Sequence, residues 1–265
     1  LLANTLIFCW PLFIGALLKA ALPFAGAQRS INYWVHACAQ TWIAVNKGWM
    51  DLVQPIQWDV QGLESVDMQH PYLVTSNHQS WVDILVLQKV FNRRIPFMRF
   101  FLKRQLFWVP LLGLAWWALD FPFMGRYTKK QIARDPALAR RDIDATRRAC
   151  EQFRAIPVSI MNFVEGTRFT QVKHDAQKAP YRHLLKPKSG GVAFVLDAMG
   201  DGLQAILDVT IAYPAGRPSL LDLLADRIPE VRVQVRQRAI PEAMVRGDYQ
   251  NDRGFRVLFQ QWING

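Results

Sequence analysis

The chain has 265 residues and a formal net charge of +11, and 51% of its residues are hydrophobic. This length suits one large domain, or one domain with an appendage. The composition is apolar for a soluble enzyme, and the positive charge favours anionic partners such as phosphate headgroups or an acidic membrane surface. Nucleic acid is not expected as a partner, because the chain has no zinc-finger spacing, aromatic ribonucleoprotein motif or dense basic arm.

Cysteine and histidine spacing gives no sign of a disulfide framework or a metal centre. Cys9, Cys38 and Cys150 are widely spaced and form no Cys-x-x-Cys pair, which fits a reducing compartment. The chain has no His-x-x-x-His pattern and no clustered set of carboxylates. We therefore expect no metal and no bound cofactor.

The first segment, Leu1–Leu18, is almost uncharged and predicts a membrane-embedded helix. A run of about 18 apolar residues is at the lower limit for spanning a bilayer, so spanning and re-entry both stay open. No basic start precedes the run, as a signal peptide would require. Pro23 and Gly26 mark a turn after this helix.

A second segment, Ile31–Met50, places tryptophan and aliphatic residues on one face at intervals of three and four. This spacing predicts an amphipathic helix, and the preference of tryptophan for the headgroup level favours an interfacial position. An ordinary helix that faces the core is the alternative. We predict that residues 1–53 form hydrophobic and amphipathic membrane-associated helices and that residues 54–265 form the α/β domain.

The polar turn Asn77–Ser80 lies between a predicted strand and a predicted helix. Tyr72–Ser76 is a short apolar run that predicts a buried strand, and apolar residues at helical spacing continue to Phe91. A polar turn at the carboxyl end of a buried strand is where α/β sheets place ligands. If Asp83 accepts from one ring nitrogen of His78, the other nitrogen is left free as a base.

The same residues also fit a purely structural pattern. Ser80 followed by Asp83 three positions later is a capping box at the start of an apolar run. The spacing alone leaves the structural and catalytic interpretations equally open, and the two are compatible.

The middle of the chain is harder to interpret. Ile95–Leu102 predicts a strand between two basic pairs. Leu106–Leu119 is too short and too broken to span a bilayer. It either dips into lipid, lines an acyl groove or lies in the core. Asp135-Pro136 predicts a helix start, with the cap at Asp135.

A second buried strand, Pro157–Val164, delivers Glu165–Arg168 at its carboxyl end, so this tetrad and His78 are expected on one edge of the sheet. Thr170–Lys188 is predicted to be a polar, basic loop, long enough for a lid or a binding loop. Lys188–Gly191 opens a further helix as a plain cap or as an anion site that includes Lys186.

The remaining pattern completes an α/β fold with a central mixed sheet flanked by helices and an N-terminal two-helix membrane-anchoring segment. Further strands are predicted at Ile206–Tyr213 and Val231–Arg238, and a closing helix at Phe255–Ile263. The second of these strands alternates valine with polar residues, as a half-exposed strand does.

Several motifs together resemble one enzyme family. Asn77–Asp83 (NHQSWVD) resembles the His-x4-Asp block of the glycerolipid acyltransferases, the 1-acylglycerol-3-phosphate acyltransferase family. Phe163–Arg168 (FVEGTR) resembles the Glu-Gly-Thr-Arg motif, and weaker blocks are matched by Phe121–Arg126 and Ala212–Pro214. The order of the motifs makes the resemblance strong, and their wording is similar to the branch with lysocardiolipin-type enzymes.

The resemblance implies roles for individual residues. His78 is the general base and Asp83 supports its imidazolium form. The resemblance also implies substrate-binding roles for Arg126, Glu165, Gly166, Thr167 and Arg168. Arg168 suits phosphate because its guanidinium is a planar fork, and Glu165 is expected to orient Arg168 or the acceptor. Backbone N–H groups near Gly166, or at the helix start after Ser80, are candidate donors to the oxyanion.

The implied reaction moves an acyl group from acyl-CoA or acyl carrier protein to the sn-2 hydroxyl of 1-acylglycerol-3-phosphate, giving phosphatidic acid. The chain has no Gly-x-Ser-x-Gly elbow, which fits a reaction in which the acceptor is itself the nucleophile. Another lysophospholipid acceptor, of the lysophosphatidylglycerol or lysocardiolipin type, is the first alternative. A lipid ester or thioester hydrolase and a non-catalytic binder of lipid surfaces are the others. We expect the protein at a membrane, on the cytoplasmic face of the inner (cell) membrane.

Overall fold

A six-stranded mixed sheet forms the centre of the fold. The computed structural model describes residues 2–125, 134–135, 137 and 157–264. The sheet has the order β1-β8-β7-β2-β6-β3, in which β7 and β8 pair antiparallel and the other four pairs are parallel. Its strands are β1 (Gln57–Gln61), β2 (Tyr72–Ser76), β3 (Met98–Phe100), β6 (Ser159–Phe163), β7 (Ala205–Ala212) and β8 (Glu230–Arg238). The predicted α/β class with a central mixed sheet is confirmed.

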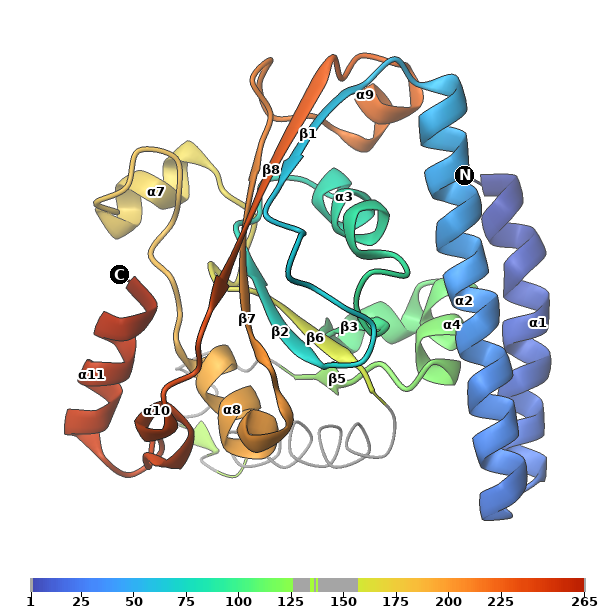
Figure 1. Ribbon diagram of the computed structural model, residues 1–265, viewed down its shortest axis with the longest axis horizontal. Coiled ribbons are helices and arrows are strands. Elements are labelled where there is room, and N and C mark those ends of the chain that lie inside the picture. The colour runs from blue at the N-terminus through green and yellow to red at the C-terminus, as the bar shows by residue number, and fades with distance from the viewer. Residues whose placement is uncertain (1, 126–133, 136, 138–156, 265) are drawn as a thin grey trace.

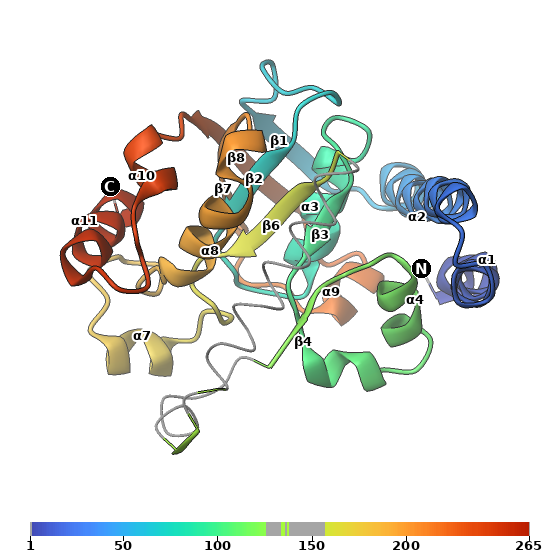
Figure 2. The same ribbon diagram turned by 90° about the horizontal axis from the view of Figure 1, so that it is seen from below.

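Helices cover both faces of this sheet (Figures 1 and 2). One face carries α3 (Val82–Phe91), with α1 (Leu2–Ala21), α2 (Ala25–Val53) and α4 (Leu112–Ala118) beyond it. The other face carries α8 (Gly190–Met199), α10 (Glu242–Arg246) and α11 (Arg253–Asn264). The short elements α7 (Gln171–Gln177) and α9 (Leu220–Leu224) lie in the loops that follow β6 and β7.

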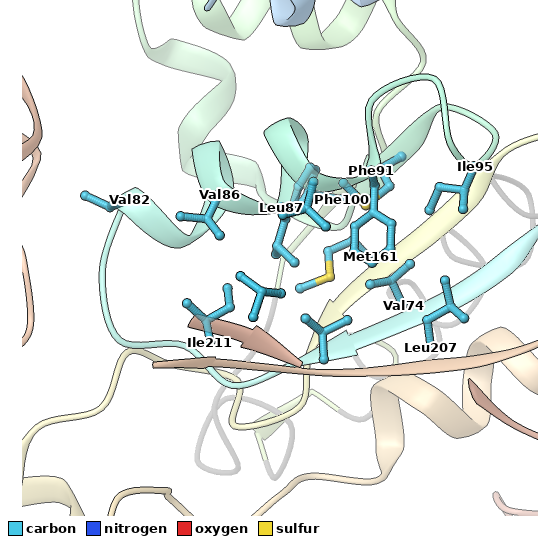
Figure 3. Packing of buried hydrophobic residues seen from close by; sticks show 14 of the residues in the cluster. Val74, Val82, Val86, Leu87, Phe91, Ile95, Phe100, Met161, Leu207 and Ile211 are labelled. Carbon is cyan, nitrogen blue, oxygen red and sulfur yellow. The ribbon is translucent and has the colours of Figure 1, made fainter. Parts of the chain in front are cut away.

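The central strand β2 is buried along its whole length because both of its faces are covered. Leu73 belongs to the hydrophobic cluster that includes α8 and α11, whereas Val74 belongs to the cluster that includes α3. Successive strand residues point to opposite faces, so a strand covered on both sides needs an unbroken apolar run. Figure 3 shows the α3 side, where Val86 and Leu87 pack toward Val74 and Met161.

The two N-terminal helices pack against each other and extend beyond the sheet (Figure 1). α1 is long and apolar enough to cross a membrane by its length and composition. Its outward side chains include Trp10 and Leu17, which are 70% and 71% exposed. α2 buries Ile31, Val35 and Ile43 on one side. The division of the chain into residues 1–53 and 54–265 stays a prediction.

The structure corrects several predicted elements. The turn after the first helix contains Pro23, but Gly26 already lies inside α2. The single strand predicted at 95–102 is two short strands, β3 and β4 (Leu102–Lys103), and β4 pairs with β5 (Phe123–Met124). Residues 170–188 are not one loop, because Thr170 accepts a hydrogen bond from the Lys173 N–H and caps helix α7. Strand β1 was missed, since its residues alternate between exposed and half-buried.

The segment predicted at 106–119 divides into a 3-10 turn (Arg104–Trp108) and α4. α4 packs on α1 and buries Ala115 and Ala118, so part of the segment lies in the core, and its contact with lipid or with an acyl chain stays a prediction. Trp108, just before it, is 80% exposed. The helix predicted from Asp135-Pro136 lies almost entirely outside the described residues.

Candidate active site

The site lies where the carboxyl ends of β2 and β6 meet. These strands are parallel and adjacent, with Ser76 in register with Phe163, so the turns that follow them lie side by side. The Phe169 N–H donates to the carbonyl oxygen of His78 at 2.7 Å, and the Val164 N–H donates to that of Ser76 at 3.3 Å. The sheet therefore brings the His-x4-Asp segment and the Glu-Gly-Thr-Arg segment together, as their positions after predicted strands indicated.

Asp83 is fully buried, and its carboxylate accepts four hydrogen bonds. Oδ2 accepts from His78 Nδ1 at 2.9 Å and from the backbone N–H groups of Gln79 and Ser80 at 2.6 and 2.8 Å. Oδ1 accepts from the Tyr213 hydroxyl at 2.6 Å. A buried carboxylate is tolerated only when such donors replace its water shell.

This arrangement fixes the state of the His78 ring. A carboxylate can only accept, so Nδ1 carries the hydrogen and Nε2 is the nitrogen left with a lone pair. The ring is half-buried, with its side chain 14% exposed. The pair has the geometry of a histidine base oriented by an acid.

The capping interpretation is correct in part. The Ser80 N–H donates to Asp83, which is one half of a capping box. In the other half, Ser80 Oγ accepts from the Val82 N–H at 3.1 Å rather than from the residue three positions on. Asp83 thus shapes the turn and holds His78 with the same carboxylate.

Two residues of the site were not assigned by sequence reasoning. Tyr213 was noted only as part of a weak motif, although its hydroxyl bonds Asp83; burial and the neighbouring Asp83 charge raise its pKa, so the hydroxyl stays a donor. The side chain of Asn77 makes the two hydrogen bonds that a strand backbone would make. Its Nδ2 donates to the Ile211 carbonyl oxygen at 2.9 Å, and its Oδ1 accepts from the Ile211 N–H at 2.8 Å. The sequence feature that could have identified Asn77 and Tyr213 is their position, because each lies directly after the carboxyl end of a strand.

The hydrogen bonds given by the described residues to the Glu165 carboxylate come from backbone N–H groups, and none of them comes from Arg168. Glu165 is 2% exposed, and its two carboxylate oxygens accept from the backbone N–H groups of His78 and Leu185, each at 2.9 Å. Burial raises the pKa of Glu165, and the two N–H donors oppose that rise. Its observed contacts hold the turn that carries His78 against the segment before α8.

The Gly166–Arg168 turn gathers positive charge at the surface. Arg168 is exposed and its guanidinium lies over the Trp81 ring, 5.0 Å from the centroid. Lys173 Nζ donates to Thr167 Oγ1 at 2.8 Å and to the Arg168 carbonyl at 3.0 Å. Gly166 has φ +68, a conformation that favours glycine, and a Cβ at this position would lie 3.3 Å from the Lys188 amine. Arg126, the other predicted phosphate contact, lies outside the described residues.

Two of the backbone groups in the segments expected to bind an oxyanion are engaged elsewhere. The Gly166 N–H donates to the Phe163 carbonyl at 2.9 Å, and the Ser80 N–H donates to Asp83. Neither amide is therefore available to a tetrahedral intermediate in this arrangement. Within the described ranges, no cluster of three His, Cys, Asp or Glu side chains could hold a metal ion.

Comparison with known proteins shows the family of the chain. A family model described as Acyltransferase matches residues 57–214, which include the His-x4-Asp and Glu-Gly-Thr-Arg segments. The chain belongs to the acyltransferase family. This assignment rests on more than half of the chain.

Individual members of the acyltransferase family are similar over most of the chain. The 1-acyl-sn-glycerol-3-phosphate acyltransferase 3 of Arabidopsis thaliana is 25% identical over an alignment of 220 residues that covers 73% of this chain and 55% of that protein. The 1-acyl-sn-glycerol-3-phosphate acyltransferase gamma of Mus musculus is 27% identical over an alignment of 210 residues that covers 71% of this chain and 53% of that protein. This chain thus spans about half the length of these relatives.

A solved structure of the acyltransferase family shares the fold. The crystal structure of the 1-acyl-sn-glycerophosphate (LPA) acyltransferase PlsC from Thermotoga maritima superimposes with a TM-score of 0.53. The superposition covers 99% of this chain and 94% of PlsC at 16% sequence identity. At that identity the likeness concerns the fold.

Substitution of Tyr213 by phenylalanine tests the buried carboxylate. The change leaves Asp83 Oδ1 buried without its hydroxyl donor, and we expect a loss of about 1–3 kcal/mol in the free energy of unfolding. We also expect about a tenfold lower turnover number, equivalent to about 1.4 kcal/mol in the barrier. Thermal unfolding and steady-state turnover measure the two effects. Tyr33→Phe, at a side chain that is 80% exposed, is the matched control and should change neither.

Proposed function

We propose that the chain is a membrane-associated acyltransferase that transfers a fatty acyl group from a thioester to the sn-2 hydroxyl of 1-acylglycerol-3-phosphate. The observation that carries this proposal is the His78–Asp83 pair, with the Nδ1–Oδ2 distance of 2.9 Å and the basic Gly166–Arg168 turn beside it. The family assignment and the names of the two relatives support the same reaction class.

In this reaction His78 acts as the general base. Its Nε2 takes the proton of the acceptor hydroxyl while the hydroxyl oxygen forms a bond to the thioester carbonyl carbon. The tetrahedral intermediate then collapses, the carbon–sulfur bond breaks, and the departing sulfur receives the proton from the imidazolium. Asp83 stabilises the positive charge that the ring carries between these two proton transfers.

Arg168 suits the phosphate of the acceptor. Its guanidinium is exposed, and the ion pairs of the described residues do not include one for it. Contact with the Trp81 ring restricts the position of the guanidinium, whose planar set of N–H donors suits phosphate oxygens. Lys173 and Lys188 add positive charge to the same turn. Because these contacts recognise a phosphate, another lysophospholipid remains the alternative acceptor.

The thioester is carried by acyl-CoA or acyl carrier protein, both of which are anionic and suit a chain with a net charge of +11. The apolar outer side of α1 suits a bilayer, since Trp10 and Leu17 are exposed there. Attachment on the cytoplasmic face of the inner membrane stays a prediction.

Loss of His78 distinguishes the transferase from its alternatives. Purified protein in detergent with radiolabelled acyl-CoA should form phosphatidic acid only when lysophosphatidic acid is present. His78→Ala should lower this rate by about 10²–10⁴-fold, because a positioned general base contributes that much. His70→Ala, at an exposed histidine before the amino end of β2, should leave the rate unchanged.

The products separate the remaining outcomes. Free fatty acid formed without acceptor would favour a hydrolase, and acylation of lysophosphatidylglycerol alone would favour the alternative acceptor. Full turnover by His78→Ala would contradict the mechanism.

Replacing Arg168 by alanine tests the phosphate contact. Charge-assisted hydrogen bonds contribute about 1.5–3 kcal/mol, so we expect the KM for lysophosphatidic acid to rise by about 10- to 100-fold. The KM for acyl-CoA should change little. Arg253→Ala, at an exposed arginine of α11, is the control. An acceptor KM that stays at the wild-type value would exclude Arg168 from phosphate binding.

The apolar side of α1 can be tested by charge. The double variant Trp10→Glu/Leu17→Glu removes two apolar side chains, each of which contributes about 1.5–3 kcal/mol when buried, so vesicle binding should weaken at least about tenfold. Cosedimentation with phosphatidylglycerol-containing vesicles measures the change. Val257→Glu/Leu258→Glu changes two exposed apolar residues of α11 and should bind as the wild type does. Equal binding by both double variants would argue against α1 as the anchor.

A further inference from the structure

An aromatic ring lies flat against the imidazole of His78. The ring belongs to Phe163, the last residue of β6, and the two ring centroids are 3.8 Å apart with an interplanar angle of 14°. This is a stacked contact over the whole face of the imidazole, rather than an edge contact. No hydrogen bond joins the two side chains, so the contact itself must account for any influence of Phe163 on His78.

The backbone determines this stacking. Phe163 is in register with Ser76 across the β2–β6 pair, and His78 follows two residues later, so the two side chains leave adjacent strand ends. Behind Phe163 lies the buried ring of Phe100 on β3, with a centroid distance of 6.4 Å. The Phe169 N–H holds the His78 carbonyl oxygen at 2.7 Å. Both partners of the stack are therefore held in place from more than one side.

We propose that Phe163 is a positioning residue of the reaction, whose ring fixes the plane of His78 and whose π-face stabilises the imidazolium that forms during proton transfer. This inference rests on the proposed function of His78 as the general base. An aromatic face attracts a cation that lies within about 6 Å of its centroid, and 3.8 Å is well inside that range. The neutral imidazole gains less, so the contact strengthens as the proton moves.

A contact that strengthens during proton transfer favours the transition state over the ground state, and therefore raises kcat rather than lowering KM. Two carboxylates also face His78: Asp83 contacts Nδ1, and Glu165 accepts from its backbone N–H. Both act in the plane of the ring or through the backbone. Phe163 contacts the flat face of the imidazole, so its effect can be varied while the two carboxylates are unchanged.

The test varies the electron density of the ring while keeping its shape. The full chain is prepared in detergent with phenylalanine, 4-fluoro-, 3,5-difluoro- and 3,4,5-trifluorophenylalanine at position 163, because fluorine withdraws charge from the π-face. The pH dependence of kcat/KM is measured, and the ring of His78 is titrated by NMR without substrate. The same four side chains at position 100, which is buried behind Phe163, provide the matched control.

We expect each added fluorine at position 163 to move the acid limb of the profile, and the NMR midpoint of His78, to lower pH. Phe163→Leu should move both by about half a pH unit and lower kcat by about three- to tenfold with little change in KM. The series at position 100 should move neither midpoint. NMR midpoints that stay constant across the series at position 163 would overturn the inference.

The two readouts separate this inference from the function on which it rests. A shifted NMR midpoint in a protein without acyltransferase activity would retain the stacking effect and reject the proposed reaction. Normal acyl transfer with constant midpoints would retain the reaction and reject the role of Phe163.

Discussion

The site depends on one buried carboxylate. Asp83 accepts hydrogen bonds from the His78 ring, from two backbone N–H groups of its own turn and from Tyr213, so it joins β2, α3 and the end of β7 at a single group. A buried charge with fewer donors would be strongly destabilising. The same four contacts that make the carboxylate tolerable therefore also fix the turn and the tautomer of His78. The turn therefore cannot be stable without the same hydrogen bonds that orient His78 as a base.

The sheet brings together the distant chain segments that form the site. Parallel pairing of β2 with β6 and with β7 puts three chain segments at one edge, although His78 and Glu165, which follow β2 and β6, are 87 residues apart in the sequence. The side chain of Asn77 bonds the backbone of Ile211 and so extends the pairing of β2 with β7 by one residue. Glu165 accepts from backbone N–H groups in the turn after β2 and in the segment before α8. Both residues satisfy backbone groups that would otherwise be buried without partners. The edge is consequently rigid at the point where His78 leaves it.

The sequence predicted those parts of the fold that have strong local signals. The apolar runs of β2 and β6 and the spacing of α3 predicted the strand–turn–helix joint, and with it the meeting of His78 with the Glu-Gly-Thr-Arg segment. The role of Glu165 could not be predicted, because its partners are backbone N–H groups at residues 78 and 185, which carry no side-chain signature. Strand β1 was not predicted from the sequence for a related reason. It is a strand because it pairs with β8, and its own residues do not form an apolar run. Contacts between distant backbone segments are what local patterns omit.

Charged side chains also tie the N-terminal helices to the domain that carries the site. Lys19 of α1 bonds Asp120 at 2.9 Å and the Ala118 carbonyl at 2.7 Å, at the end of α4. His36 of α2 accepts from buried Arg99 of β3 at 2.7 Å, because burial and the nearby guanidinium lower the pKa of His36 to about 3 and keep its ring neutral. β3 also carries Phe100, which packs behind Phe163. A helix pair held by such directed contacts cannot pivot freely, so a bilayer that binds α1 would also set the orientation of the sheet edge where His78 lies.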